Sequence, residues 1–167
     1  MAASLPQPEF IPPAFSARFT RYFSKYVRRM IAKQFNAVRI LPEHAGALAE
    51  WNEARAPGLV LIAHCSWWDP LITLALHSHF EPGRVCLAPM DATQLKNFAI
   101  FRKVGIFGIN PDDPRSLGAM GEFIAERFRT NPFTTLWITP QGRFTDVRAP
   151  IEIRPGAAAI AARTPGI

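Results

Sequence analysis

Apolar runs of strand type alternate with helical segments along most of this chain. The runs are GLVLIAH at 58–64, VCLAPM at 85–90, VGIFGIN at 104–110 and TTLWITP at 134–140. They lack a clean alternation of polar and apolar residues, which is typical of strands that are covered on both faces. Strands that alternate with helices predict an α/β fold, with a mostly parallel central sheet flanked by helices.

Helix signals fill the segments between these runs. Asp69 followed by Pro70 is a signal for the start of a helix. Asp91 with Gln94 predicts a capping box at the start of the next helix. We therefore expect helices at 69–80, 91–103, 114–129 and 155–163, the third with Leu117, Met120, Ile124 and Phe128 on one face.

The first 43 residues are organised differently from the rest. Residues 1–13 are interrupted by prolines and predict a loose leader. Within residues 14–43, aromatic and aliphatic residues recur every three or four positions, which predicts a basic amphipathic helix that starts near Pro13 and is followed by a link. Residues 1–36 hold six basic residues and one acidic residue, so this segment carries +5 of the net charge of +6. Such a local patch indicates an anionic partner: lipid headgroups, nucleic acid or a phosphorylated ligand.

The stretch HCSWWD, residues 64–69, follows the first apolar run. His64 is expected where that strand ends, and ligands of open α/β sheets bind at the carboxyl ends of the strands. Imidazole is the side chain best suited to take up a proton at neutral pH. Asp69 lies five residues on, across a turn, and can fold back to hydrogen-bond the imidazole while it also caps the helix. A plain helix cap beside two packed tryptophans is the alternative interpretation.

Two more loops are expected at the same edge of the sheet. The stretch PQGRFTD at 140–146 offers a glycine turn and the guanidinium of Arg143, which together can bind phosphate. The stretch NPDDPRS at 110–116 places Arg115 at the start of a helix, where anions also bind. Each arginine taken singly is equally well a solvated surface residue. The convergence of three loops predicts a functional site shared by His64 and Asp69 with both of these loops.

With these stretches the sequence resembles the glycerolipid acyltransferase superfamily, the PlsC-like (lysophosphatidate acyltransferase) group. AHCSWWDP matches its first box, His-x4-Asp. VGIFGINPDDPRS is similar to its second box, with Asn110 and Pro111 where an acid and an arginine usually stand. IRPGAAAIA is similar to the Lys/Arg-x-Gly helix of the family, around Gly156. The resemblance covers roughly residues 45–167.

The third box of the family reads Phe-Pro-Glu-Gly-Thr-Arg, and ITPQGRF is similar to it. Pro140 and Gly142 are kept, whereas Gln141 stands for Glu, Arg143 for Thr and Phe144 for Arg. These departures suggest an altered acceptor site beside an intact His-Asp pair. The acceptor can therefore differ from lysophosphatidate, and a glycosylated lipid alcohol is one alternative.

The resemblance implies acyl transfer from acyl-CoA or acyl carrier protein to a lipid or glycerol-phosphate-type hydroxyl, as in phospholipid biosynthesis by 1-acylglycerol-3-phosphate O-acyltransferases. His64 would be the general base and Asp69 would orient it. The resemblance implies no metal and no cofactor beyond the acyl donor. Residues implied in acceptor binding are Asn110, Arg115, Gln141, Gly142 and Arg143.

The end of the sequence bears on a second interpretation. The fourth box of the family, a proline-rich strand, would begin where Ile167 stands. We therefore expect residues 44–167 to form an acyltransferase domain that is truncated at its C-terminal end. An inactive or partial membrane-binding relative of the family is the alternative function.

Bulk features predict a cytoplasmic protein attached peripherally to the inner face of the cell membrane. Two cysteines, Cys65 and Cys86, provide no disulfide framework, and a reducing compartment is the simpler interpretation. No secretory signal and no apolar run of ~18 residues is present. The basic helix then suits an anionic membrane surface, while a helix packed on the domain with a solvated charged face remains the alternative.

Three other functions are less well supported. A hydrolase built on Cys65 or Ser66 lacks the G-x-S-x-G elbow. Nucleic-acid binding by the basic helix lacks a recognisable motif. A metal site is disfavoured because His77 and His79, two residues apart on a helix, do not share a face; its other ligands would be His64 and Cys86.

Overall fold

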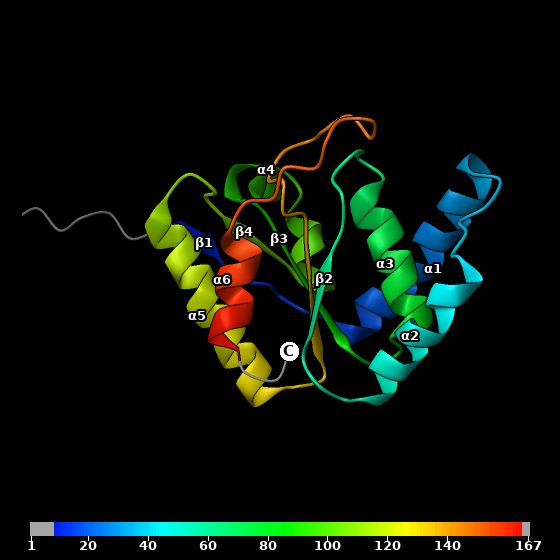
Figure 1. Ribbon diagram of the computed structural model, residues 1–167, viewed down its shortest axis with the longest axis horizontal. Helices are drawn as coiled ribbons and strands as arrows, with labels where there is room; N and C mark the ends of the chain where they lie inside the picture. Colours follow the sequence, from blue (N-terminus) through cyan, green and yellow to red (C-terminus); the bar gives the residue numbers. More distant parts are fainter. Residues whose placement is uncertain (1–8, 165–167) are drawn as a thin grey trace, which may run out of the picture.

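The computed structural model of the chain describes residues 9–164, apart from the side chains at positions 45, 48, 49 and 51. Figure 1 shows how its helices and strands are arranged. In chain order they are β1 (Phe10–Ile11), α1 (Ala17–Gln34), α2 (Pro42–Glu53), β2 (Gly58–Leu61), α3 (Asp69–Phe80), β3 (Val85–Asp91), α4 (Ala92–Asn97), the 3-10 helix η1 (Ala99–Val104), β4 (Ile106–Ile109), α5 (Pro114–Thr130), β5 (Thr134–Ile138) and α6 (Gly156–Arg163).

The strands form one sheet in the order β1-β4-β3-β5-β2. The four strands predicted from the apolar runs are β2 to β5, and they pair in parallel. The α/β prediction with a mostly parallel sheet is therefore confirmed. The register places Leu136 of β5 between Leu59 of β2 and Leu87 of β3. Successive parallel strands require crossover connections, and the two longest contain α3, between β2 and β3, and α5, between β4 and β5.

Helices cover the sheet from both sides (Figure 1): α5 and α6 lie on one side, and α1, α2 and α3 on the other. The first side holds the main hydrophobic cluster, formed by Leu87, Phe107, Ile109, Met120, Ile124, Phe128, Leu136, Ile138, Ala157 and Ile160. The second side holds a smaller cluster of Val27, Ile31, Leu74 and Val104. The predicted apolar face of α5 is buried except for Leu117, which lies in the first turn of the helix and is 38% exposed.

The prediction of a loose leader is wrong for the residues just before α1. Phe10 and Ile11 form β1, which pairs antiparallel with the edge strand β4. The ring of Phe10 packs on Phe107 and Phe123, with centroids 5.9 and 5.2 Å apart. The unpaired edge of β4 and this aromatic contact explain why so short a strand forms. Residues 1–8 of the predicted leader lie outside the described residues.

The helix predicted for residues 91–103 is divided into α4 and η1. The Asp91 half of the expected capping box is confirmed, because the Gln94 N–H donates to Asp91 Oδ1 at 3.0 Å. Gly105 ends η1 with φ at +96°, a conformation that side chains rarely adopt. A Cβ atom at this glycine would lie 1.8 Å from the carbonyl oxygen of Cys86. The close approach of β3 to β4 therefore requires glycine at position 105.

Gly105→Ala is expected to lower the free energy of unfolding by about 3 kcal/mol or more, because the strained φ and the clash with β3 add together. Gly118→Ala is the matched control: it lies within α5 with nothing within 4 Å of its would-be Cβ. The control should be neutral or raise stability by about 1 kcal/mol. Urea unfolding followed by circular dichroism measures both, and equal effects of the two substitutions would contradict the close strand approach.

Candidate functional site

The candidate site lies at the carboxyl ends of the parallel strands. The loop after β2, residues 62–68, leads into α3, and the loop after β5, residues 139–155, leads into α6. Figure 1 shows both loops at the same end of the molecule. Because β2 and β5 are neighbours in the sheet, the two loops start side by side.

His64 and Asp69 face each other, as the sequence predicts. His64 Nδ1 lies 2.9 Å from Asp69 Oδ2, and the two side chains are 20% and 15% exposed. Because a carboxylate can only accept, this contact assigns the ring hydrogen to Nδ1. Nε2 then keeps its lone pair and can accept a proton from another molecule.

Asp69 also holds the loop that carries the histidine. Its Oδ2 atom accepts from the backbone N–H groups of Cys65 at 2.8 Å and Ser66 at 2.9 Å. Asp69 is the first residue of α3, Trp68 is the N-cap residue, and no side chain caps this helix. The expectation that Asp69 caps α3 is therefore wrong: the carboxylate turns back to the preceding loop, where three donors converge on it.

The loop after β5 clamps the backbone of His64. The His64 N–H donates to Gln141 Oε1 at 3.1 Å, and the Thr145 N–H donates to the His64 carbonyl oxygen at 2.8 Å. Gln141 Nε2 donates to Thr145 Oγ1 at 3.1 Å, which closes the ring of contacts. Gln141 is only 4% exposed. Its side chain thus holds the histidine in place, a role that the sequence alone did not indicate.

Phe144, in the same loop, covers the imidazole. The two ring centroids are 4.1 Å apart and the planes are inclined by 31°. Trp67 in turn packs on Phe144, with the two ring centroids 5.0 Å apart. No role was predicted for this phenylalanine; the signals for it are its place in a loop expected at the site and its replacement of the arginine of the third box.

The arginines of the predicted site are engaged with carboxylates. Arg143 pairs with Glu152 at 2.8 Å, and both side chains are largely exposed. Arg115 pairs with Asp113 at 3.1 Å, and hydrogen bonds from this arginine hold the pKa of Asp113 below its usual value. Gly142 adopts φ at +67°, and the space beside it is occupied by Arg154. These contacts place Arg143 and Gly142 in the loop that holds His64.

Asn110 lies in the loop after β4, and its described hydrogen bonds are local. Its N–H donates to Ser116 Oγ at 2.8 Å, and its Oδ1 atom accepts from the Asp112 N–H at 3.0 Å. Ser116 Oγ in turn donates to the carbonyl oxygen of Glu9 at 2.7 Å. The structure therefore joins His64, Asp69 and Gln141 directly, while Asn110 is held by its own loop and by the segment before β1.

The alternative metal ligands point elsewhere. His77 is buried: its Nε2 lies 3.1 Å from the Arg84 carbonyl oxygen, and its Nδ1 accepts from Trp137 Nε1 at 3.3 Å. Cys86 is also buried, and this burial raises the pKa of its thiol. Within residues 9–164, no group of three or more His, Cys, Asp or Glu side chains is placed to hold a metal ion.

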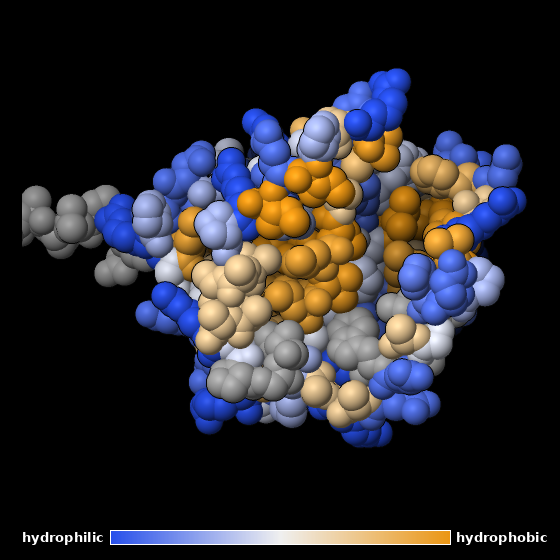
Figure 2. Space-filling view, viewed as in Figure 1, coloured by the Kyte–Doolittle hydropathy of each residue, from blue (hydrophilic) through white to orange (hydrophobic). Residues whose placement is uncertain are grey.

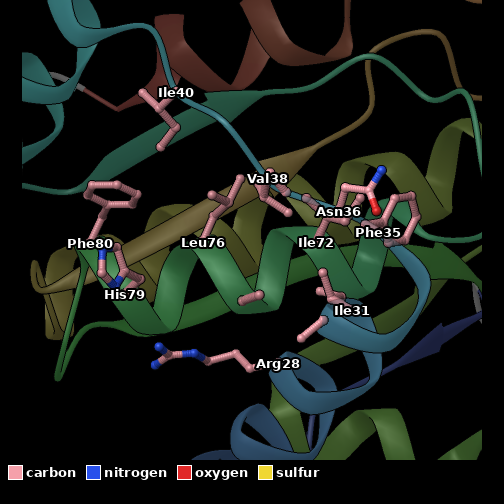
Figure 3. Close-up of a pocket in the computed structure, with 13 residues that line it drawn as sticks. Arg28, Ile31, Phe35, Asn36, Val38, Ile40, Ile72, Leu76, His79 and Phe80 are labelled. Carbon is pink, nitrogen blue, oxygen red and sulfur yellow. The ribbon is translucent and has the colours of Figure 1, made fainter.

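A separate apolar hollow of about 580 Å³ runs along α3 (Figure 3). It lies between α3, the end of α1 and the segment that follows α1, and residues such as Ile72, Leu76 and Val38 line it. None of its lining residues belongs to the loops around His64. One of its lining residues, Phe35, contacts Trp68 edge-on, with ring centroids 5.0 Å apart.

Comparisons with known proteins identify one match. The model of a family described as "Acyltransferase" matches residues 35–167, which include both site loops and all the parallel strands. No curated protein and no solved structure gave a match.

Gln141→Ala is expected to accelerate amide hydrogen exchange at His64 and Thr145 by about fivefold, since it removes a hydrogen bond worth ~1 kcal/mol from each side of the clamp. Gln94→Ala is a suitable control, because Gln94 lies on α4 and its described hydrogen bonds use only its backbone N–H and carbonyl groups. Exchange measured by mass spectrometry on peptides that span each position tests this. Unchanged exchange at both amides would show that Gln141 does not hold the loop.

Proposed function

Because the chain belongs to the acyltransferase family, the PlsC-like glycerolipid group, we propose that it transfers a fatty acyl group from a thioester to a hydroxyl of a lipid or glycerol-phosphate-type acceptor. The donor in this proposal is acyl-CoA or acyl carrier protein. The observation that carries the proposal is the 2.9 Å contact between His64 Nδ1 and Asp69 Oδ2, which leaves Nε2 as a base.

The proposed reaction needs one proton to move twice. His64 Nε2 accepts the proton of the acceptor hydroxyl while the oxygen attacks the thioester carbonyl carbon. The tetrahedral species collapses, the carbon–sulfur bond breaks, and the leaving thiolate takes the same proton from the imidazolium. The products are the new ester and a free thiol, and no acyl-enzyme forms.

Asp69 supports this step in two ways. It fixes the ring through Nδ1, which leaves Nε2 to act as the base, and its charge stabilises the imidazolium that forms when the hydroxyl is deprotonated. The backbone N–H groups of Cys65 and Ser66 both donate to Asp69 Oδ2, and these hydrogen bonds hold the carboxylate in position beside the ring. In the proposal, Gly142 and Arg143 contact the acceptor because they belong to the loop that clamps His64, and Asn110 and Arg115 contact it from the loop after β4.

His64→Ala is expected to reduce acyl transfer by about a thousandfold, the usual contribution of a general base. Asp69→Asn should reduce it by a similar factor, because the amide can present a donor to Nδ1 and favour the wrong tautomer. His44→Ala, at an exposed histidine of α2, is the control and should retain full activity.

The assay combines the full chain, an acyl-CoA and a panel of lipid alcohols, with the ester detected by mass, since the exposed thiol of Cys65 would react with thiol reagents. Equal product from wild type and His64→Ala would exclude the proposed base. Absence of product with every acceptor would overturn the proposed function, and vesicle binding without product would favour the inactive membrane-binding alternative.

The proposal includes attachment to an anionic membrane surface through α1. The aromatic stripe of this helix is divided: Phe19 and Phe23 pack toward the domain, whereas Tyr22 and Tyr26 are 71% and 54% exposed. The basic residues Arg18, Arg21, Lys25, Arg28, Arg29 and Lys33 are all exposed on the same helix, which contains no acidic residue. No helix among residues 9–164 is long and apolar enough to cross a bilayer.

Exposed tyrosines between cations suit the headgroup layer, because the rings sit at the interface while the cations contact anionic lipid. The alternative was a helix that packs on the domain and leaves its charged face in solvent. One side of α1 does pack in this way, through Val27 and Ile31. The two interpretations are therefore compatible: one face of α1 packs and the other is free to meet a membrane.

Replacing Arg21, Lys25 and Arg29 together by Gln is expected to weaken binding to phosphatidylglycerol vesicles roughly a hundredfold, at ~1 kcal/mol per cation. Replacing Arg127, Arg129 and Arg148 by Gln removes the same charge from α5 and the loop after β5, and should have little effect. Co-sedimentation at low and high salt measures both. Equal losses from the two triple variants would show only a net-charge effect, and salt-sensitive binding to duplex DNA but not to vesicles would favour nucleic acid.

A further inference from the structure

Two aromatic rings, Phe144 and Trp67, form an aromatic wall beside the candidate base, His64. Phe144 lies 4.1 Å from the His64 ring, centroid to centroid, and is 44% exposed, while Trp67 beside it is 69% exposed. Both rings are therefore available to a molecule that approaches His64. A hydroxyl that hydrogen-bonds His64 lies close to the Phe144 ring, because the two ring centroids are only 4.1 Å apart, so a molecule that carries the hydroxyl can contact aromatic surface.

More exposed apolar side chains lie further along the loop that contains Phe144. Val147, Ile151 and Ile153 are 78%, 64% and 63% exposed. Figure 2 shows hydrophobic residues gathered at the surface on the β2 side of the sheet, between α6 and α3. Leu61 at the end of β2 is 48% exposed and lies on the same strand that leads to His64. Exposed apolar side chains thus lie both on the strand that leads to His64 and in the loop that clamps it.

The cations of this loop do not form a ready phosphate site. Arg143 is paired with Glu152 at 2.8 Å, and Arg148 with Asp146 at 2.7 Å. Exposed pairs of this kind cost only ~1 kcal/mol to break, so the pairs alone do not exclude an anion. Arg154 is a further cation of this loop, and its guanidinium lies against Gly142.

The wall itself disfavours a charged headgroup. The face of an aromatic ring carries negative electrostatic potential, so a phosphate dianion next to Phe144 is repelled rather than attracted. An anion in such a place also loses hydration without gaining the charge-assisted donors that normally replace it. An uncharged alcohol with an apolar body gains contact area and loses little hydration.

From this geometry we propose that the acceptor is an uncharged lipid alcohol, without phosphate next to the reacting hydroxyl, and that Phe144 determines this preference. The inference rests on the proposed acyl transfer and narrows its acceptor class. The reacting bonds are those given above: the alcohol O–H breaks, the ester C–O forms and the thioester C–S breaks, with the proton passing through His64 to the leaving thiol.

Two acceptors that differ only by a phosphate test the proposal: 1-oleoylglycerol and 1-oleoylglycerol 3-phosphate, each in the same neutral detergent micelles with the same acyl-CoA. The full-length wild type is expected to use the uncharged acceptor with kcat/KM about tenfold higher or more, which corresponds to the energy of one good aromatic contact. A preference for the phosphorylated acceptor would overturn the inference and leave the proposed acyl transfer standing. No ester from either acceptor, with the protein folded, would overturn both.

Variants of the wall identify its role. Phe144→Arg is expected to narrow or invert the acceptor preference, and Phe144→Ala to raise KM for the uncharged acceptor about tenfold with a smaller change in kcat. Phe98→Ala is the matched control, since Phe98 is 47% exposed, contacts one other phenylalanine ring at 6.0 Å and lies outside both loops. The control should keep the wild-type ratio.

Arg154→Gln tests the remaining possibility, that Arg154 binds a phosphate of the acceptor. If the acceptor is uncharged, this variant should leave the ratio of kcat/KM values between the two acceptors within twofold. Suppose instead that kcat/KM falls only for the phosphorylated acceptor in this variant, while Phe144→Arg and Phe144→Ala keep the wild-type selectivity. That result would show that Arg154 binds the phosphate and that the inference is wrong. If Phe144→Arg fails to fold, the wild-type comparison and Phe144→Ala still decide the matter.

Discussion

The geometry of the site depends on one carboxylate oxygen. Asp69 Oδ2 accepts from the ring of His64 and from two backbone N–H groups of the preceding loop. A charged acceptor with three donors is a strong local constraint, because losing any donor leaves part of the charge uncompensated. Loop shape and ring orientation are therefore set by the same atom, and the imidazole is positioned before any substrate arrives.

The order of the strands explains why residues far apart in sequence meet at His64. The parallel ladder of β2 and β5 continues past Leu61, where the Ile62 N–H donates to the Ile138 carbonyl oxygen at 3.1 Å. The next inward N–H of the ladder belongs to His64, and it meets the Gln141 side chain. The carbonyl of Pro140 is taken by the Arg154 N–H. The glutamine thus replaces a backbone partner at the point where the ladder ends.

Periodicity and helix signals predicted those features of the fold that depend on residues close together in the sequence. The strands, α3, α5 and the pairing of His64 with Asp69 follow from residues close in sequence. The strand β1 could not be predicted, since two residues form it only because the edge of β4 and the ring of Phe107 are there to receive them. The clamp by Gln141 and the cover by Phe144 depend on β5 lying next to β2, and a single sequence does not give the order of strands. The turn of Asp69 back to His64 was predicted, but the expectation that it also caps α3 was wrong, because an Asp-Pro signal is the same for a cap and for a residue that turns back.

A second polar cluster, at the other end of α3, helps to fix the position of Asp69 relative to His64. Glu81 and Arg84 are buried side by side, with Arg84 Nε 3.4 Å from Glu81 Oε2, and burial lowers the pKa of the arginine although the glutamate partly offsets this. Thr135 of β5 donates to Glu81, and Arg84 Nε donates to Thr135 at 3.1 Å. Buried charges hold only one arrangement, because each displaced partner costs several kcal/mol, on the order of 3–5. The helix α3 is therefore fixed to β5 at its end and to the His64 loop at its start, so a shift of the helix that would separate Asp69 from His64 also strains a buried ion pair.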